Sequence, residues 1–288
     1  MGSQEALTHT GGQTVGQGHD AAGVTAAPAL LATFLKVGKA DAIVLQTPGS
    51  VVMVDTGEAS TVEKVVGKLR KMGVTRIDHL IITHYDQDHV GGAAGVLDAF
   101  PVQSVHTTYG SKTSPEVKAY EAAMGRAGLV AEEVHGAVTF TLDGVRYDLL
   151  GPASASYPTN VSNNSSLVTR VTCGERSLLL AADIQRERID ELLASGCDLS
   201  CDVLKMPHHG AWEDNLPALL AACAPLATVI TSSKLQRESD AAVASIRAAG
   251  AEALLTRKGA VRVSTDGSSL VVEQRRARRD LTPLGSAA

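Results

Sequence analysis

The stretch Thr83–Gly92, T-H-Y-D-Q-D-H-V-G-G, constrains the fold more than any other part of this 288-residue sequence. It places four side chains that bind metals within six consecutive positions: His84, Asp86, Asp88 and His89. The run His79–Ile82 before it predicts a buried strand, and Gly91 and Gly92 after it predict a tight turn into a helix. Two imidazoles and two carboxylates form a mixed N/O ligand set that suits zinc, manganese or iron. A solvated polar loop would explain the composition but not its place behind a buried strand, so the stretch predicts a metal site.

Three further segments carry similar side chains at the ends of predicted strands. Asp183 follows the apolar run 178–182, where an unpaired carboxylate is costly, so it either bridges two cations or caps the helix 184–193. His208 and His209 follow the predicted strand 202–206. Adjacent side chains of an extended chain point in opposite directions, so one of the two is expected to bind metal. Asp55 also ends a strand, and it either holds the free N–H of a ligand histidine or forms a turn.

Apolar runs separated by Gly, Pro, Asn and Asp predict alternating strands and helices. Strands are predicted at 30–37, 42–46, 51–54, 79–82, 102–106, 138–142, 145–150, 167–172, 177–182, 202–206, 226–231, 253–256, 261–264 and 269–273. Helices are predicted at 60–72, 93–99, 115–126, 184–193, 214–223 and 239–249.

The motif H-x-D-x-D-H followed by Gly-Gly resembles the signature of the metallo-β-lactamase superfamily, in the form with Asp at the second position. Other segments resemble the hydrolase domain of ComEC-type competence proteins and their free-standing relatives, in the same order and spacing. They are Phe34–Ala42, Val54–Gly57, Asn164–Leu167, Leu180–Asp183 and Asp202–Gly210. The resemblance covers roughly residues 30–275. It implies an α/β fold, the four-layer αββα sandwich.

The resemblance also implies a site for two divalent metal ions, with zinc expected and manganese as the alternative. His84 and Asp86 would hold one ion, while Asp88, His89 and His209 would hold the other, with Asp183 bridging both. His208 would then be free to contact the scissile group or to protonate the leaving group. Asp86 or Asp183 would steer the proton.

The sequence departs from the superfamily pattern near its expected third histidine, where Ser162, Asn163 and Asn164 stand instead. We therefore expect the first metal to be weakly held. Asn164 is expected to contact substrate or a metal-bound water, with a turn-forming Asn as the alternative. Lys205 either neutralises a substrate phosphate or reaches solvent from its strand. Tyr109 and Lys112 are expected on a loop that rims the site, where they either touch substrate or belong to a plain surface loop.

Composition limits the partners of the chain. The formal net charge of −5 gives no general attraction to nucleic acid or anionic membrane, although it leaves room for a local basic groove. No apolar run approaches the length of a transmembrane helix. The N-terminus shows no signal peptide, so an extracytoplasmic location is expected if an export segment was trimmed, and a cytoplasmic one otherwise. The four cysteines are expected to be small buried residues, with a Cys197–Cys201 disulfide as the alternative.

Three regions are predicted along the chain. Residues 1–28 are rich in Gly, Thr, Gln and Ala and predict a disordered leader or linker. Residues 29–275 form the hydrolase-like domain. Residues 276–288 are predicted to be a flexible tail, and the basic run 275–279 is interpreted as solvated rather than as a nucleic-acid arm.

The expected function is metal-dependent hydrolysis by a metal-bound hydroxide at a dinuclear site. The aspartate-rich motif, through its resemblance to ComEC-type proteins, favours a phosphodiesterase or nuclease-like enzyme with a phosphodiester substrate, nucleic acid among the candidates. A hydrolase of lactams, lactones or thioesters is the alternative within the same superfamily. A catalytically weak, metal-bearing binding module is the third interpretation. The oligomeric state is left open.

Overall fold

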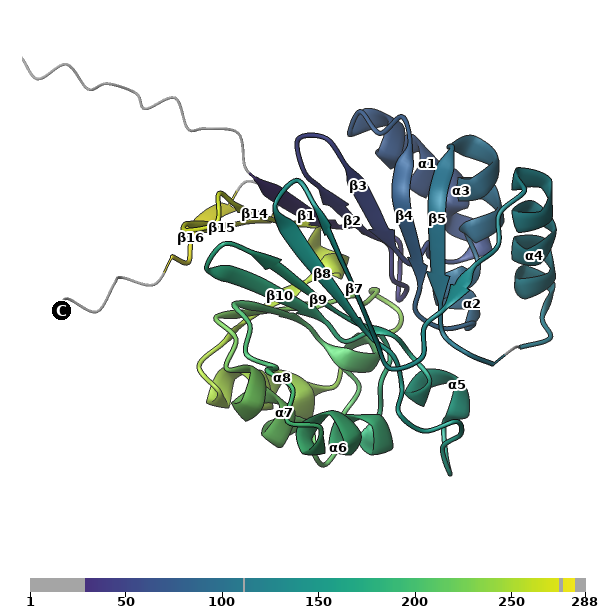
Figure 1. Cartoon of the computed structure of the whole chain (residues 1–288). Coiled ribbons are helices and arrows are strands. Elements are labelled where there is room, and N and C mark those ends of the chain that lie inside the picture. Colours follow the sequence, from purple (N-terminus) through teal and green to yellow (C-terminus); the bar gives the residue numbers. More distant parts are fainter. Residues whose placement is uncertain (1–28, 111, 275–276, 283–288) are drawn as a thin grey trace, which may run out of the picture.

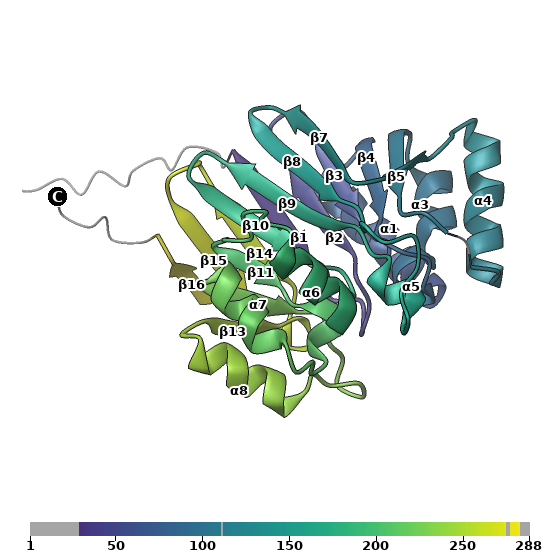
Figure 2. The same cartoon turned by 60° about the horizontal axis from the view of Figure 1, so that its bottom comes forward.

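Two β-sheets pack face to face, and helices cover the outer face of each sheet (Figures 1 and 2). This arrangement is seen in a computed structural model that describes residues 29–110, 112–274 and 277–282. The predicted four-layer αββα sandwich is confirmed.

The larger sheet, called sheet A, has nine strands in the order β16 (Ala277–Asp280), β15 (Leu270–Gln274), β14 (Val261–Thr265), β1 (Leu30–Phe34), β2 (Ile43–Gln46), β3 (Val51–Val54), β4 (Ile77–Ile82), β5 (Val102–Thr107) and β6 (Glu132–Glu133). Sheet B has seven, in the order β13 (Glu252–Leu255), β12 (Ala227–Ile230), β11 (Val203–Lys205), β10 (Arg176–Leu180), β9 (Val168–Cys173), β8 (Val145–Leu150) and β7 (Ala137–Leu142). The helices are α1 (Val62–Lys71), α2 (Gln87–Val90), α3 (Ala93–Ala99), α4 (Pro115–Ala127), α5 (Val161–Asn164), α6 (Arg186–Ala194), α7 (Leu216–Cys223) and α8 (Asp240–Ala248).

Three apolar layers hold these elements together. The inner faces of the sheets meet through residues such as Phe34, Leu45 and Tyr147. Helices α1, α3 and α4 cover the outer face of sheet A, and α6, α7 and α8 cover that of sheet B. Val65 and Leu69 show how this works locally, because their spacing of four places both on the buried face of α1. Aromatic residues make up only 3% of the chain, so Val, Leu, Ile and Ala fill most of the core.

The parallel parts of the two sheets decide where the polar side chains gather. Strands β3, β4 and β5 are parallel in sheet A, and β10 to β13 are parallel in sheet B. The segments that carry the predicted ligands follow the carboxyl ends of β3, β4, β10 and β11. Figure 1 shows the short helices α2 and α5 at this same end of the sandwich. One edge of the fold therefore collects polar residues from both sheets.

Some predicted boundaries differ from the structure. Asp88 and His89 lie on the four-residue helix α2 rather than on a loop. Helix α6 begins at Arg186 with Gln185 at its N-cap, so the capping alternative for Asp183 is wrong. Residues 277–280 form the edge strand β16, antiparallel to β15, so the flexible tail predicted to start at 276 is wrong for these residues. The predicted leader 1–28 lies outside the described residues.

The cysteines follow the prediction in part. Cys173, Cys201 and Cys223 are buried, Cys197 is exposed, and all four are free thiols. The alternative Cys197–Cys201 disulfide is therefore absent.

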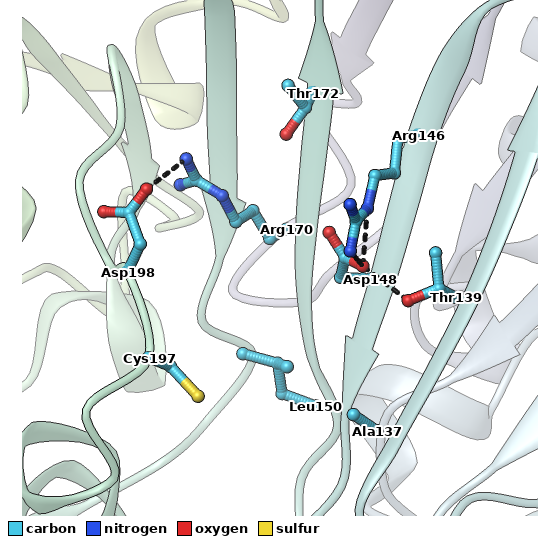
Figure 3. A pocket seen from close by; sticks show the side chains of 9 residues that line it. All are labelled: Ala137, Thr139, Arg146, Asp148, Leu150, Arg170, Thr172, Cys197 and Asp198. Atoms are coloured by element: carbon cyan, nitrogen blue, oxygen red, sulfur yellow. Dashed lines mark hydrogen bonds and ion pairs between the residues drawn. The ribbon is translucent and has the colours of Figure 1, made fainter.

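A hollow of about 450 Å³ lies on the outer face of strands β7, β8 and β9, which the helices of sheet B leave open (Figure 3). Its two arginines are neutralised locally, because Arg146 pairs with Asp148 at 2.8 Å and Arg170 pairs with Asp198 at 3.0 Å. None of the predicted metal ligands lines this hollow.

The Gly92→Ala substitution tests the close packing behind the metal-ligand stretch. A Cβ at Gly92 would lie 2.4 Å from the carbonyl oxygen of Thr56, while the backbone there, with φ −84° and ψ −5°, suits any residue. We expect overpacking to reduce the free energy of unfolding by about 1–3 kcal/mol. Thermal unfolding followed by circular dichroism measures this as a lower Tm.

Gly67→Ala is the matched control, because no atom lies within 4 Å of a Cβ at this position in the middle of α1. Alanine should stabilise the helix there by about 0.5–1 kcal/mol. Equal Tm shifts for the two variants would contradict the role of the Gly92 contact.

Candidate metal centre

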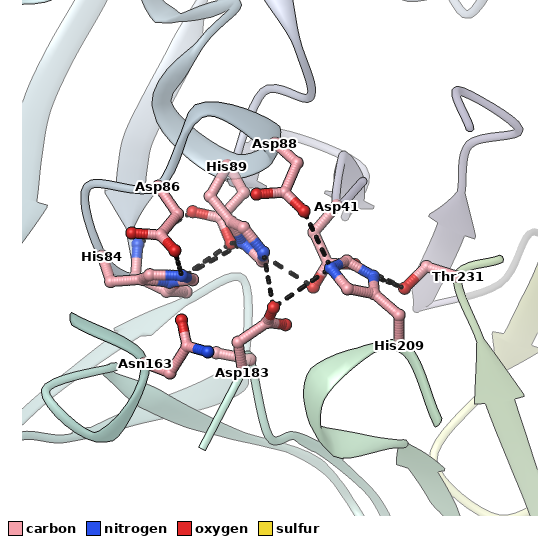
Figure 4. Close-up of polar contacts among 12 residues, drawn as sticks. Asp41, His84, Asp86, Asp88, His89, Asn163, Asp183, His209 and Thr231 are labelled. Atoms are coloured by element: carbon pink, nitrogen blue, oxygen red, sulfur yellow. Dashed lines mark hydrogen bonds and ion pairs between the residues drawn. The ribbon is translucent and has the colours of Figure 1, made fainter. Parts of the chain in front are cut away.

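Three buried imidazoles converge at the edge where the two sheets meet (Figure 4). In each ring the Nδ1 atom has a partner. That of His84 lies 3.1 Å from Thr83 Oγ1, and that of His89 lies 2.7 Å from Asp55 Oδ2. That of His209 lies 2.9 Å from Thr231 Oγ1. The Nε2 atom of each ring is buried and makes no hydrogen bond. Buried polar atoms without partners are uncommon, and imidazole nitrogens fixed through the opposite nitrogen are the usual form of metal ligands.

Four residues present ligand atoms within 4.8 Å of one another: Asp88, His89, Asp183 and His209. Asp183 Oδ2 lies 3.2 Å from His89 Nε2 and 3.1 Å from His209 Nε2. Asp88 Oδ2 lies 3.2 Å from His209 Nε2. These four residues are the set that the sequence assigned to one cation with its bridging carboxylate, and the structure brings them together from both sheets.

His84 and Asp86 flank this group on one side. The Nε2 atom of His84 lies 4.0 Å from Asp86 Oδ2, and the ring centroids of His84 and His89 are 4.1 Å apart. The other oxygen of Asp86, Oδ1, accepts hydrogen bonds from Lys112 Nζ at 2.7 Å and from Ser162 Oγ. One carboxylate oxygen of Asp86 therefore remains for a cation, with fewer protein ligands around it than in the neighbouring group.

The charges in this cluster favour a cation. Burial lowers the pKa of His84 to about 4, and His89 adds to that effect, so His84 is neutral near pH 7. Burial is the largest single influence on His89 and His209 and disfavours their charged forms. Asp183, together with Asp55 for His89 and with Asp88 and Asp41 for His209, outweighs burial and raises the pKa of both. Burial alone would raise the pKa of Asp183, yet His209, His89 and Lys205 hold that pKa well below its usual range. The donor set and its excess of carboxylates fit a divalent metal.

Lys205 does not lie where a substrate could reach it. Its side chain is fully buried beneath the cluster, where Nζ lies 2.5 Å from Asp41 Oδ2 and 3.4 Å from Asp183 Oδ1 and donates to the carbonyl of Ala182. The expected contact with a substrate phosphate is contradicted. Strand β11 lies in the middle of sheet B with both faces covered, so a lysine on it has no route to solvent and instead neutralises carboxylates.

Asn164 also differs from its expected role. Its side chain is buried, and Nδ2 donates to Glu187 Oε2 at 2.7 Å while Oδ1 accepts from the backbone N–H of Gln185 at 2.9 Å. These contacts tie the α5 loop to the start of α6 and leave no group for a substrate. Its neighbour Asn163 is held by a 2.9 Å hydrogen bond from Nδ2 to Gln185 Oε1, and Figure 4 draws it with the polar residues at this edge.

His208 and His209 lie on a tight turn rather than on an extended strand. Their φ angles are +43° and +53°, so the argument that neighbouring side chains of a strand point in opposite directions does not apply. His209 nevertheless joins the cluster, while His208 stays half-buried at its rim with Nδ1 unpartnered. Burial lowers the pKa of His208, and Asp183 partly opposes this.

Two residues beneath the cluster were not assigned from the sequence. Asp41 is buried and accepts a hydrogen bond from Thr231 Oγ1 at 2.6 Å, and the same hydroxyl contacts His209 Nδ1. Together they orient His209 as Asp55 orients His89. Asp41 lies within the segment Phe34–Ala42 that carried the family resemblance, but nothing in its local sequence distinguishes it from a turn-forming aspartate. Thr231 gives no signal of its own.

Comparison with known proteins agrees with this geometry. A family model described as the metallo-beta-lactamase superfamily matches residues 35–230. The chain belongs to this superfamily. Among solved structures, the metallo-beta-lactamase fold protein YhfI from Bacillus subtilis superposes with a TM-score of 0.54 at 10% identity, covering 78% of this chain and 96% of YhfI. At that identity the match establishes the fold alone.

The sequence relatives are competence and recombination proteins, which confirms the predicted resemblance. ComE operon protein 3 of Bacillus subtilis is 29% identical over 169 residues, covering 59% of this chain and 22% of the relative. Competence protein ComA of Neisseria gonorrhoeae is 28% identical over 203 residues, covering 69% and 26%, respectively. Recombination protein 2 of Haemophilus influenzae is 26% identical over 205 residues, covering 69% and 24%. This chain thus spans about a quarter of the length of these relatives. None of its helices within the described ranges has the length and apolar character needed to cross a bilayer.

Asp55→Asn tests how His89 is held. The amide keeps the shape of the side chain but weakens the acceptor that faces His89 Nδ1, so the ring is less firmly oriented toward a cation. We expect the affinity for Zn²⁺ or Mn²⁺ to fall by about 10- to 100-fold. Isothermal titration calorimetry of metal-stripped protein measures it.

Asp78→Asn serves as the control for removing a buried carboxylate elsewhere. Asp78 is also buried, but it bonds the backbone N–H of Val51 and the Arg76 guanidinium, away from the metal centre. Its replacement should leave metal affinity unchanged even if Tm falls. A similar loss of affinity in both variants would show that Asp55 acts through general stability.

Proposed function

We propose that this chain is a metal-dependent hydrolase of phosphodiesters. The observation that carries the proposal is that the buried Nε2 atoms of His84, His89 and His209 make no hydrogen bond, while two of them, those of His89 and His209, face the carboxylate of Asp183 at 3.2 and 3.1 Å. A structural polar core would pair these atoms within the protein, because each one left unpaired costs about 1–3 kcal/mol. In a metal site, by contrast, the Nε2 atoms have no hydrogen-bond partner because they bind the cation.

The ligands divide between two cations that share Asp183. One would be held by Asp88, His89 and His209, and the other by His84 and Asp86. When bound, divalent metals supply Lewis acidity and a water-derived nucleophile near neutral pH. The mixed imidazole and carboxylate set accepts zinc or manganese.

The groups at the rim favour an anionic substrate. On one side, Lys112 bonds Asp86. On the other, the half-buried Lys39 lies near His208, and its charge adds to the effects of burial and of His209 in lowering the pKa of His208. Ser162 on α5 adds a hydroxyl donor that bonds Asp86. Positive charges and N–H or O–H donors around a cation site suit phosphate oxygens better than the neutral carbonyl of a lactam. The relatives are named as competence and recombination proteins, which makes nucleic-acid phosphodiesters the class to test first.

His208 is the proposed proton donor for the leaving oxygen. It lies next to a ligand in sequence but outside the ligand group, and its Nδ1 atom has no partner. Asp183 lies between His89 and His209 and orients the reacting centre. Asp86, with Oδ1 already bonded to Lys112 and Ser162, and Asp183 are the candidates for steering the proton.

A catalytically weak, metal-bearing binding module is the second candidate. It is favoured by one observation: the group of four ligands within 4.8 Å does not include His84 or Asp86. The ion that these two would hold therefore has fewer protein ligands and is expected to bind less tightly.

Metal titration and turnover distinguish these functions. We expect metal-stripped protein to bind one Zn²⁺ or Mn²⁺ tightly and a second more weakly, and to hydrolyse bis(p-nitrophenyl) phosphate only when the second is bound. His209→Ala should reduce turnover to the level of the metal-stripped protein because it removes a ligand. His135→Ala is the control, since His135 is exposed and pairs with Glu133 at 2.9 Å.

Three outcomes would count against phosphodiester hydrolysis. Hydrolysis of a chromogenic lactam but not of the phosphate diester would favour a lactamase. Tight binding of one ion without any turnover would favour the binding module. Failure to bind metal at all would remove the basis of the proposal.

His208→Gln tests the proton donor through its dependence on the leaving group. p-Nitrophenolate leaves without protonation, whereas the sugar oxygen of a dinucleotide needs a proton. Loss of a general acid typically costs about 10²- to 10⁴-fold, so kcat on a dinucleotide should fall by this amount while kcat on bis(p-nitrophenyl) phosphate changes little. Metal affinity, measured in parallel, should be unchanged. Equal losses on both substrates would show that His208 does not donate this proton.

A further inference from the structure

A basic groove of about 510 Å³ lies on the outer face of sheet A, between α1 and strands β1, β2 and β14. Four lysines and one arginine line it: Lys36, Lys64, Lys68, Lys71 and Arg262. Lys64, Lys68 and Lys71 are spaced by four and three residues, so they occupy one face of α1. No aspartate or glutamate lines the groove.

The lysines of this groove have no charged partner among the residues that the structure describes. Across residues 29–110, 112–274 and 277–282, none of its four lysines forms an ion pair or hydrogen bond, and Arg262 only approaches Glu273 at 3.8 Å. Burial lowers the pKa of Lys64, and the nearby charges of Lys36 and Lys68 lower it further. Such crowding of like charges is unfavourable unless an anion relieves it, and it occurs in a chain whose net charge is −5.

The floor of the groove contains a polar atom without a partner. Thr33 is only 5% exposed, its side chain lines the groove, and its Oγ1 makes no hydrogen bond. Leaving a buried hydroxyl unpaired is costly, and an oxygen of a bound anion would satisfy it. The apolar side chains of Leu31, Leu35 and Met72 also line the groove, together with Gln46 and Ala260.

The loop between β1 and β2 runs from the groove toward the metal centre. Lys36 lines the groove, and Asp41, five residues later, lies beneath His209 and bonds through its backbone N–H to the carbonyl of Asp88 at 3.1 Å. Five residues span at most about 18 Å, which limits the separation of the two sites. Lys39 on the same loop lies near His208, so positive charge continues from the groove to the rim of the centre.

We propose that this groove binds a single strand of nucleic acid and leads it to the metal centre. The lysines would meet successive phosphates, Thr33 would donate to a phosphate oxygen, and the apolar floor would contact exposed bases. A duplex presents no free bases to that floor. The proposal rests on the proposed phosphodiester function for its choice of ligand, and continuity with the metal centre favours nucleic acid over an anionic lipid.

Binding by metal-free protein tests the groove separately from catalysis. Fluorescence anisotropy in EDTA follows a fluorescein-labelled oligothymidylate as salt is varied. Removing one lysine that meets a phosphate should reduce the slope of log K against log salt by about 0.7. The triple variant Lys64→Gln/Lys68→Gln/Lys71→Gln should therefore reduce the slope by about 2 and bind about 100-fold more weakly at 0.1 M salt. Thr33→Val, which removes only the hydroxyl, should weaken binding about tenfold.

The control variant changes the net charge by the same amount elsewhere. Arg70→Gln/Lys118→Gln/Arg247→Gln removes three exposed cations that do not line the groove. It should bind as the wild type does. Equal weakening in both triple variants would overturn the proposal, because general charge would then explain binding. Absence of oligothymidylate binding by the wild type would overturn it too, as would groove-dependent binding to phosphatidylglycerol vesicles without binding to the oligonucleotide.

Turnover of bis(p-nitrophenyl) phosphate separates this inference from the proposed function. The groove variants should hydrolyse this small diester at the wild-type rate, because it occupies only the metal centre. If the wild type fails to hydrolyse it, the proposed function fails. If the wild type hydrolyses the diester but the groove variants bind oligothymidylate as tightly as the wild type does, only the role of the groove is wrong.

Discussion

The need to compensate buried negative charge governs the edge where the two sheets meet. Asp41, Asp55 and Asp183 are each no more than 3% exposed, and Asp86 and Asp88 lie beside them. Lys205 pairs with Asp41 and Asp183 but supplies only one charge. A carboxylate in a protein interior costs several kcal/mol unless it is paired. The Nε2 atoms of His84, His89 and His209, which make no hydrogen bond, lie among these carboxylates, and together they form a candidate site for cations.

Backbone strain is concentrated at this edge. Among the described residues, seven non-glycine positions have positive φ, and four of them adjoin the centre: Asp55, Ala182, His208 and His209. Each such conformation costs on the order of 1–2 kcal/mol for an L-residue. Regular strand ends would point these side chains elsewhere, so the turns aim them at a common point. The packed sheets on either side hold the turns in place, as is typical of functional sites.

The surface charge complements the chemistry of the centre. The chain is acidic overall, yet its unpaired lysines on α1 and on the loop after β1 lie on the side that leads toward His208. The other hollow, on sheet B, has its arginines neutralised by aspartates. Net charge therefore says little about where an anionic substrate would bind. The binding site depends on how charge is distributed over the surface, and that distribution depends on which helix faces lack oppositely charged neighbours.

The sequence by itself determined the elements of the fold and most members of the centre. Helix and strand periods are local, so α1, α4 and most strands were predicted to within a few residues, while α2, α5 and β16 are too short to show a period. The H-x-D-x-D-H stretch carries its four side chains within one short segment, where their proximity follows from the chain. Only the tertiary structure decided that Asp41 and Thr231 support His209, that Lys205 is buried, and that Asn164 bonds to the start of α6. Those outcomes depend on which strands lie in the middle of a sheet and on where α6 begins, and residues far apart in sequence set both.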